Sequence, residues 1–299
     1  MKVLVAGGTG LLGTAITEAA IAAGHDVTVL SRSARQSDLP DARASVARGD
    51  VLAPATLPPA LSGMDVVVDA VQFPGSPIEN KRKGYTFERV DLGGTKNLVD
   101  AAKEAGVRQF IGLSGVGAAA DGEYFWLRYK WQEEEHIRAS GLPFTIFRPS
   151  WIYGPQDVAL NRFLGFARFL PFVPVIGNGK GRLNPLFVKD LGAHVVAAAG
   201  NEEALNRVFE IGGPEILTMD DILRTALRVS GKRRFLFHSP KGLVKLSAWF
   251  AQYLPGPPIT PDAVDFITMA AVADTTDLSA VFGLRLTPLE EALGTYLRK

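Results

Sequence analysis

The sequence predicts an α/β fold: a parallel sheet wound by helices on both faces, that is, a doubly wound sheet. Two observations support this prediction. A β-branched apolar run, Lys2–Ala6, is followed by glycines and then by an Ala-rich helical pattern that reaches Ala23. Short apolar runs then alternate with helical patterns along the first half of the chain. Parallel strands need such crossover helices, and a sheet covered on both faces has nearly continuous apolar strands.

Six strands are expected in the first 150 residues, at 2–6, 26–30, 44–47, 65–71, 109–114 and 144–148. Helices are expected between them at 11–23, 90–105 and 124–140. The second half should add strands at 183–188 and 207–212, a helix capped by Asp190, and a helix opened by a capping box from Thr218 to Asp221. We expect a sheet of about seven strands and a smaller C-terminal region woven onto it.

The first 13 residues carry the strongest functional signal. Gly7, Gly10 and Gly13 lie three apart between the first strand and the first helix. The free N–H groups and positive dipole end of a helix attract an anion, and glycine lets a phosphate approach the backbone closely. A second strand follows Gly24, so the βαβ unit has the length of a dinucleotide site. The alternative is a glycine turn that only connects strand and helix.

The residues after the second strand bear on which dinucleotide binds. Ser31, Arg32 and Arg35 stand where NAD sites usually place an acidic residue for the ribose hydroxyls. A guanidinium group instead matches the extra phosphate of NADP, so the pattern favours NADP(H) over NAD(H). The alternative is that both arginines are solvated loop charges.

The segment 7–13, GGTGLLG, resembles the glycine motif of extended and atypical short-chain dehydrogenases/reductases, and further matches follow in order at 49–51, 65–71, 94–98, 111–115, 147–149 and 153–155. The resemblance is closest to the branch that holds NmrA-like proteins and the NADPH-binding accessory subunit of respiratory complex I. It implies a Rossmann fold with residues 1–150 as the nucleotide domain and 151–299 as the substrate-binding region. The implied cofactor contacts are Gly7, Thr9, Gly10, Leu11, Leu12, Gly13, Ser31, Arg32, Arg35, Asp50, Val51, Ala70, Val71, Gln72, Ser114, Lys130, Pro149, Trp151 and Ile152.

Ser114 and Lys130 are the candidate catalytic residues. The family usually carries Tyr-x-x-x-Lys, in which one helical turn places a phenol beside an ammonium and lowers the pKa of the phenol. Lys130 aligns with that lysine, but Trp126 stands in place of the tyrosine. Tyr129 lies about 100° around the helix and cannot replace it. Lys130 is expected to bind the nicotinamide ribose or to donate the proton itself. The alternative is a solvated ion pair with Glu134.

Ser114 ends a strand, where its hydroxyl either orients a substrate carbonyl or only caps the turn. Asp50 is likewise open to a second interpretation, as the cap of a short helix.

Composition narrows the remaining possibilities. The chain has 299 residues, 47% of them hydrophobic, which is enough for a large core. A net charge of +1 gives no electrostatic case for nucleic acid, and the absence of cysteine excludes thiolate chemistry. The four histidines show no metal-ligand spacing, so no metal is expected. No leader and no transmembrane run are apparent, so a cytoplasmic protein is the expectation.

The apolar stretch 161–172 suits a substrate pocket, a surface that faces a membrane, or ordinary packing. A second amphipathic stretch, 242–254, suits packing on the body of the protein or contact with a partner. Together these features predict an NADP(H)-dependent oxidoreductase acting on a small apolar substrate. A non-catalytic NADPH-binding sensor, scaffold or respiratory-complex assembly protein stays open, because the usual tyrosine is missing. A sugar-nucleotide epimerase or dehydratase also fits the fold.

Overall fold

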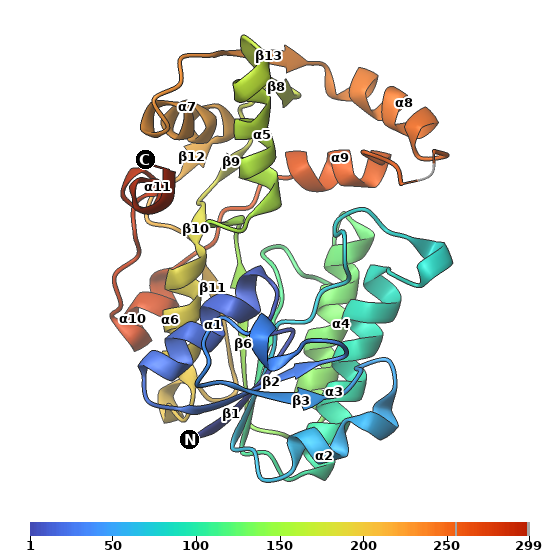
Figure 1. Cartoon of the computed structure of the whole chain (residues 1–299), viewed down its shortest axis with the longest axis vertical. Coiled ribbons are helices and arrows are strands. Elements are labelled where there is room, and N and C mark those ends of the chain that lie inside the picture. Colours follow the sequence, from blue (N-terminus) through green and yellow to red (C-terminus); the bar gives the residue numbers. More distant parts are fainter. Residues whose placement is uncertain (255, 298–299) are drawn as a thin grey trace.

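The computed structural model describes residues 1–254 and 256–297. At its centre lies a seven-stranded sheet whose neighbouring strands are all parallel, in the order β11-β6-β5-β4-β1-β2-β3 (Figure 1). Its strands are β1 (Lys2–Ala6), β2 (Asp26–Ser31), β3 (Ser45–Arg48), β4 (Val66–Asp69), β5 (Gln109–Leu113), β6 (Phe144–Pro149) and β11 (Arg207–Ile211). The predicted doubly wound sheet is confirmed. The strand order reverses between β1 and β4, where such folds bind ligands.

Helices cover both faces of this sheet (Figure 1). On one face α1 (Leu11–Ala22) packs against α6 (Val188–Ala198); on the other lie α2 (Pro58–Leu61), α3 (Gly93–Glu104) and α4 (Phe125–Ala139). The alternation of β1 explains the two cores, since Val3 and Val5 join the apolar cluster of the first face while Leu4 and Ala6 join that of the second. A wide helical turn over 87–92 leads into α3.

The C-terminal region extends from the end of β6. It contains β7 (Ile152–Tyr153), α5 (Val158–Phe169), β8 (Phe172–Ile176), β9 (Arg182–Leu183), β10 (Leu186–Phe187), β12 (Leu217–Thr218), α7 (Met219–Val229), β13 (Phe235–Ser239), α8 (Lys241–Ala251), α9 (Pro261–Thr268), α10 (Thr276–Phe282) and α11 (Leu289–Leu297). β11 returns to the main sheet beside β6, so the two parts are interwoven. No helix within 1–254 and 256–297 has the length and apolar character needed to cross a membrane.

Two local predictions for this region are wrong. The strand expected at 183–188 is split into β9 and β10, and Val188 already belongs to α6. The split falls at Asn184, whose side chain exchanges hydrogen bonds with the backbone of Ala273. The expected cap of α6, Asp190, lies inside the helix and instead accepts hydrogen bonds from the backbone and hydroxyl of Thr287 at 2.7 and 2.8 Å. The Thr218 to Asp221 capping box forms as predicted.

Candidate functional site

The glycine turn lies at the carboxyl end of β1 and touches the end of β4. Gly7 has φ +78°, and a Cβ there would lie 2.5 Å from the carbonyl oxygen of Ala70. A Cβ on Gly13 would overlap the backbone of Gly7. Both glycines are therefore needed by the fold itself, since they let β1, α1 and β4 converge.

Gly10 differs from these two glycines. It is the exposed N-cap of α1, with φ −80° and ψ 175°, a conformation open to any residue. A Cβ there would approach only the oxygen of Gly7, at 3.4 Å. Neither a capping side chain nor a first-turn acid occupies this end of α1. The space in front of Gly10 and the N–H groups of Leu11, Leu12 and Gly13 therefore fits a pyrophosphate, with Thr9 exposed beside it.

A basic edge lies at the ends of β2 and β3. Arg32 is exposed, and its guanidinium carbon lies 5.9 Å from the centre of the Tyr85 ring. Arg48 ends β3 opposite Ser31, and its Nη1 donates to the carbonyl oxygen of Arg32 at 2.9 Å. Arg48 was not among the predicted site residues, because only the pairing of β2 with β3 brings it to Arg32. Ser31 Oγ accepts from the Ala34 N–H, and Arg35 is exposed beyond this turn.

Two loops contain the residues expected near the adenine, Asp50 and Val51, and those expected at the end of β4, Ala70 to Gln72. Asp50 Oδ1 accepts from the N–H of Leu52 at 2.9 Å, which closes a turn rather than capping the helical turn that begins at Pro54. Val51 is buried, and its carbonyl oxygen accepts from Asn97. Ala70 and Val71 are half-buried and Gln72 is exposed, directly beside the glycine turn.

Lys130 lies on α4 with a side chain only 17% exposed. Its Nζ donates to Glu133 Oε2 at 2.8 Å and to the carbonyl oxygen of Leu113, the last residue of β5, at 3.3 Å. The alternative of a solvated pair with Glu134 is wrong, because Glu134 is buried and binds Arg138 and Arg148. Burial disfavours the ammonium, but the carboxylates of Glu133, Asp91 and Asp69 outweigh it and raise the pKa of Lys130. The side chain therefore stays charged at neutral pH.

Three buried carboxyl groups face this lysine. Burial raises the pKa of Glu133 to about 7 despite the attraction of Lys130, and burial likewise raises the pKa of Asp91 to about 7. The pKa of Asp69 is raised by burial too. Because these acids interact, a proton bound by Glu133 or Asp91 near neutral pH is shared within the group. Among residues 1–254 and 256–297, no group of three or more His, Cys, Asp and Glu is arranged to hold a metal ion.

Two of these carboxyl groups also fix the loop that follows β4. Asp69 accepts from Thr95 Oγ1 at 2.6 Å and from the Val71 N–H at 3.0 Å, while Asp91 accepts from the Phe73 N–H at 3.3 Å. The sequence offered one signal for this cluster, namely that Asp69 ends an apolar strand. Asp91 and Glu133 look like ordinary helix-surface acids until the helices are packed.

Ser114 directly follows β5, beside the carbonyl oxygen that Lys130 contacts. Its N–H donates to Phe147, but its buried Oγ has no hydrogen-bond partner among the described residues, and neither has Glu133 Oε1. Both residues line a cavity of about 10 Å³ together with Asp69 and Thr95. That volume is about the size that one water molecule needs. The Ser114 hydroxyl therefore does not cap a turn and is available for a hydrogen bond.

Trp126 fills the position of the family's tyrosine with an apolar contact. It is 3% exposed and stacks on Tyr124 at 4.6 Å between ring centres, with Phe87, Phe125 and Phe266 around it. Tyr129 packs on Phe125, and burial together with the charge of Glu88 raises the pKa of its phenol. Neither tyrosine is therefore arranged as the activated phenol that the family motif provides.

Pro149, Trp151 and Ile152 lie where the chain leaves β6 for the C-terminal region. The Pro149 carbonyl oxygen accepts from the Val116 N–H of the loop after β5, at 3.1 Å. Trp151 stacks on buried Tyr153 at 6.1 Å, and Ile152 begins β7. These residues join the loop of Ser114 to the C-terminal region.

The C-terminal region contains a larger cavity of about 250 Å³. Its apolar lining includes Phe163, Met219, Ile267 and Met269, and the loop 177–181 forms one side. Met269 also packs against the aromatic cluster around Trp126, so the cavity adjoins the face of α4 that carries this cluster. In the stretch 161–172, Leu164 packs in the core and Phe163 faces the cavity, whereas Phe169 is 87% exposed.

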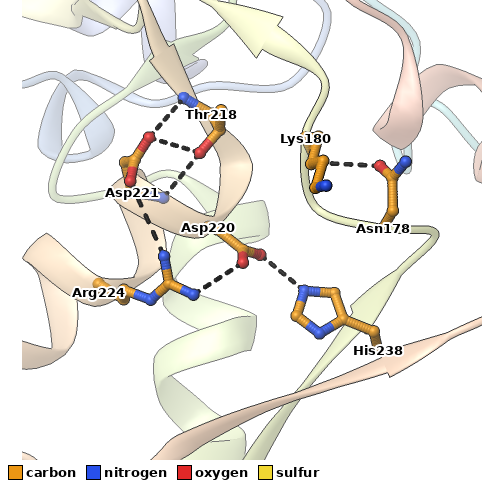
Figure 2. A network of polar contacts seen from close by, with 7 residues as sticks. All are labelled: Asn178, Lys180, Thr218, Asp220, Asp221, Arg224 and His238. Carbon is orange, nitrogen blue, oxygen red and sulfur yellow. Dashed lines mark hydrogen bonds and ion pairs between the residues drawn. The ribbon is translucent and has the colours of Figure 1, made fainter.

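A backbone hydrogen bond joins the loop 177–181 to the start of α7, and Figure 2 shows the side-chain contacts around this place. Asp220 accepts from Arg224 at 3.0 Å and lies 2.8 Å from His238 Nε2 of β13, while its N–H donates to the Gly179 carbonyl oxygen. Asn178 closes the loop by accepting from the N–H of Lys180. A side chain on Gly179 would overlap Asp220, which explains the glycine. Hydrogen bonds therefore hold the loop that forms this side of the cavity.

Comparisons with known proteins agree with this geometry. Residues 7–162 match the family described as NAD(P)H-binding. The chain is 26% identical to the photosystem II assembly factor Ycf39 of Synechocystis sp. (99% of this chain, 90% of that one). It is 27% identical to the mitochondrial NADH dehydrogenase [ubiquinone] 1 alpha subcomplex subunit 9 of Rattus norvegicus (71% and 57%), and 25% identical to the NAD(P)H azoreductase of Xenophilus azovorans (77% and 74%).

Among solved structures, UDP-glucuronic acid 4-epimerase from Bacillus cereus in complex with NAD shares the fold, with a TM-score of 0.78 at 19% identity over 99% of this chain and 98% of that one. The family match covers the glycine turn, the basic edge and the Lys130 cluster. The chain therefore belongs to the NAD(P)H-binding family, within the atypical short-chain dehydrogenases/reductases that its glycine motif resembles.

Proposed function

We propose that this chain is an NADP(H)-dependent reductase of small apolar acceptors. In this proposal residues 1–150 bind the cofactor and residues 151–299 bind the acceptor. The observation that carries it is the position of Lys130: a buried, charged ammonium that donates to the carbonyl oxygen of Leu113 at the carboxyl end of β5, where the buried hydroxyl of the next residue, Ser114, has no hydrogen-bond partner among the described residues. Burying a charge at a strand end is costly, and it is typical of sites that act on a ligand.

The fit of the cofactor rests on the open face of Gly10, where a side chain would meet only one atom. The pyrophosphate would bind the N-terminus of α1, and the extra phosphate of NADP would bind between Arg32 and Arg48. Val51 and Asp50 would border the adenine, with Ala70 to Gln72 along the dinucleotide. Pro149, Trp151 and Ile152 would lie against the nicotinamide and Lys130 would bind its ribose. When bound, NADPH supplies a hydride.

The chain itself must then supply a proton to the reduced acceptor. Proton transfer is most efficient from a group whose pKa lies near the working pH. The raised pKa of Lys130 makes it a weak acid, so its role is to hold the ribose and to stabilise negative charge on the acceptor. Glu133, with a pKa of about 7, is the better proton source, and a water in the 10 Å³ cavity that Glu133 and Ser114 line would carry the proton onward. Tyr129 has no part in this chemistry.

The acceptor is proposed to be mainly apolar because Phe163, Met219, Ile267 and Met269 line the 250 Å³ cavity. Asn178, Lys241 and Thr268 add polar groups to the same lining. The azoreductase relative suggests which compounds to try first. Oxidation of NADPH, followed by its absorbance, is measured with an azo dye, a quinone and an enone, and NADH is run in parallel. We expect at least one acceptor to be reduced, faster with NADPH. Binding of NADPH without oxidation by any of the three acceptors would reject the reductase.

A second function is favoured by Trp126: an NADPH-binding assembly factor without turnover. An indole packed on Tyr124 removes the usual proton donor, and the relative that covers 99% of this chain is an assembly factor. This candidate predicts micromolar or tighter NADPH binding, a rise in melting temperature with NADPH, and no acceptor reduction. The sugar-nucleotide epimerase alternative has only the fold in its favour, because Trp126 replaces the tyrosine that its chemistry needs.

A further inference from the structure

The segment 235–254 carries many large apolar side chains that the described part of the molecule leaves exposed. It comprises β13, α8 and the turn after α8. Eight of its large side chains are between 49% and 72% exposed: Phe235, Phe237, Leu243, Leu246, Trp249, Phe250, Tyr253 and Leu254. Isolated exposed apolar residues are common, but a contiguous group of this kind marks a contact surface.

The helix α8 is oriented with its apolar side outward. Leu243, Leu246 and Phe250 follow one another at helical spacing, and Tyr253 and Leu254 continue the same stripe. Figure 1 shows α8 at the upper right, beyond α9 and away from the central sheet. On its inner side Ala248 is buried, and Lys241 and Lys245 bind Asp265 of α9 at 2.9 and 2.7 Å. In most surface helices, by contrast, the apolar side faces the protein and the charged side faces the solvent.

The chain around this segment is basic, although the whole chain is nearly neutral. Residues 229–261 contain Lys232, Arg233, Arg234, Lys241 and Lys245 but no aspartate or glutamate. The two lysines of α8 are partly neutralised by Asp265, whereas Arg233 and Arg234 are exposed immediately before β13. The whole chain has 32 basic and 31 acidic residues, so this charge is concentrated locally.

We propose that this surface, residues 232–254, docks onto the face of a membrane that contains anionic lipid. An exposed apolar stripe that includes Trp and Tyr and follows two exposed arginines is typical of helices that lie in the headgroup layer. Basic groups near such a surface are attracted by its negative potential. A second copy of the chain fits less well, because two basic segments would then face each other.

Flotation of the full-length protein with lipid vesicles tests this. The wild type should float with vesicles of phosphatidylcholine and phosphatidylglycerol but not with phosphatidylcholine alone, and added salt should reduce binding. Leu246→Glu and Phe250→Glu should each weaken binding at least tenfold, and so should the Arg233→Glu, Arg234→Glu double variant. Val158→Glu is the matched control: Val158 is 76% exposed on α5, and its replacement should leave vesicle binding unchanged.

Equal melting temperatures and NADPH affinities of all variants show that folding and the nucleotide site are intact. Absence of wild-type binding to the anionic vesicles, or unchanged binding of both glutamate variants of α8, would overturn the proposal. So would a wild-type dimer in sedimentation analysis that Leu246→Glu dissociates while vesicle binding is absent. That last result would assign the surface to self-association.

Discussion

Replacing Gly10 with valine separates nucleotide binding from folding. The Cβ meets only the Gly7 oxygen at 3.4 Å, and the backbone angles suit valine, so the fold loses at most about 1 kcal/mol for the altered N-cap. The branched side chain fills the space in front of α1 where the phosphate approaches. Loss of two charge-assisted hydrogen bonds there costs about 3–6 kcal/mol, which predicts at least about 100-fold weaker NADPH binding.

Fluorescence titration with NADPH and a thermal unfolding curve measure both quantities. Gly165→Val on α5 is the matched control, because a Cβ at Gly165 has no atom within 4 Å, and it should bind NADPH normally. Gly13→Val, by contrast, should fail to fold stably, since its side chain would overlap the Gly7 backbone. A folded Gly10→Val protein with wild-type affinity would refute the reasoning and reduce the glycine turn to a connector.

Three further predictions concern the basic edge and the Lys130 cluster. Arg32→Asp should weaken NADPH binding by about 1–3 kcal/mol and leave NADH affinity within a few-fold of the wild type, as measured by titration. Equal affinities of the wild type for NADPH and NADH would contradict the proposed preference for NADP(H). Lys130→Met should lower kcat by about 10²–10⁴-fold while Tyr129→Phe stays within a few-fold; the opposite ranking would contradict the assignment. In the folded protein the pKa of Glu133 is raised from its ordinary 4.5 to about 7. The protonated carboxyl therefore contributes stability that is fully present below pH 4.5 and is lost as pH rises through 7. Urea unfolding should therefore show that, between pH 5 and 8, the free energy of unfolding of the wild type falls by up to about 2 kcal/mol more than that of Glu133→Gln. The kcat should fall over the same pH range only in the wild type. Parallel pH profiles of the two proteins would exclude Glu133 as the proton source.

The nucleotide half of the fold was predictable because its signals are local. A buried strand, a glycine turn and a helix follow each other within residues 2–22, and the order of strands along the chain implies a doubly wound sheet. The 183–188 strand was wrong because Asn184 forms its hydrogen bonds with a residue 89 positions away, which no local pattern can reveal.

The candidate site was predictable only where residues lie at strand ends. Ser114, Asp50 and the glycines could be placed from their positions in the βαβ pattern. Arg48 and Glu133 could not be placed in this way. The position of Arg48 depends on the register of β3 against β2, and that of Glu133 depends on which side of α4 faces β5. The amphipathic pattern of 242–254 was visible, but whether its apolar side packs inward or faces outward depends on α9.

The central claim, that the chain is a reductase and not only a binder of NADPH, is tested most directly by a single-turnover experiment. Protein saturated with one equivalent of NADPH is mixed with an acceptor that the panel identifies, and NADPH absorbance is followed for the wild type and Lys130→Met. We predict that the wild type consumes its NADPH in one phase, and that the variant, saturated with NADPH, does so at least about 100-fold more slowly. Equal rates for the two proteins, matching the uncatalysed rate in buffer, would contradict the claim.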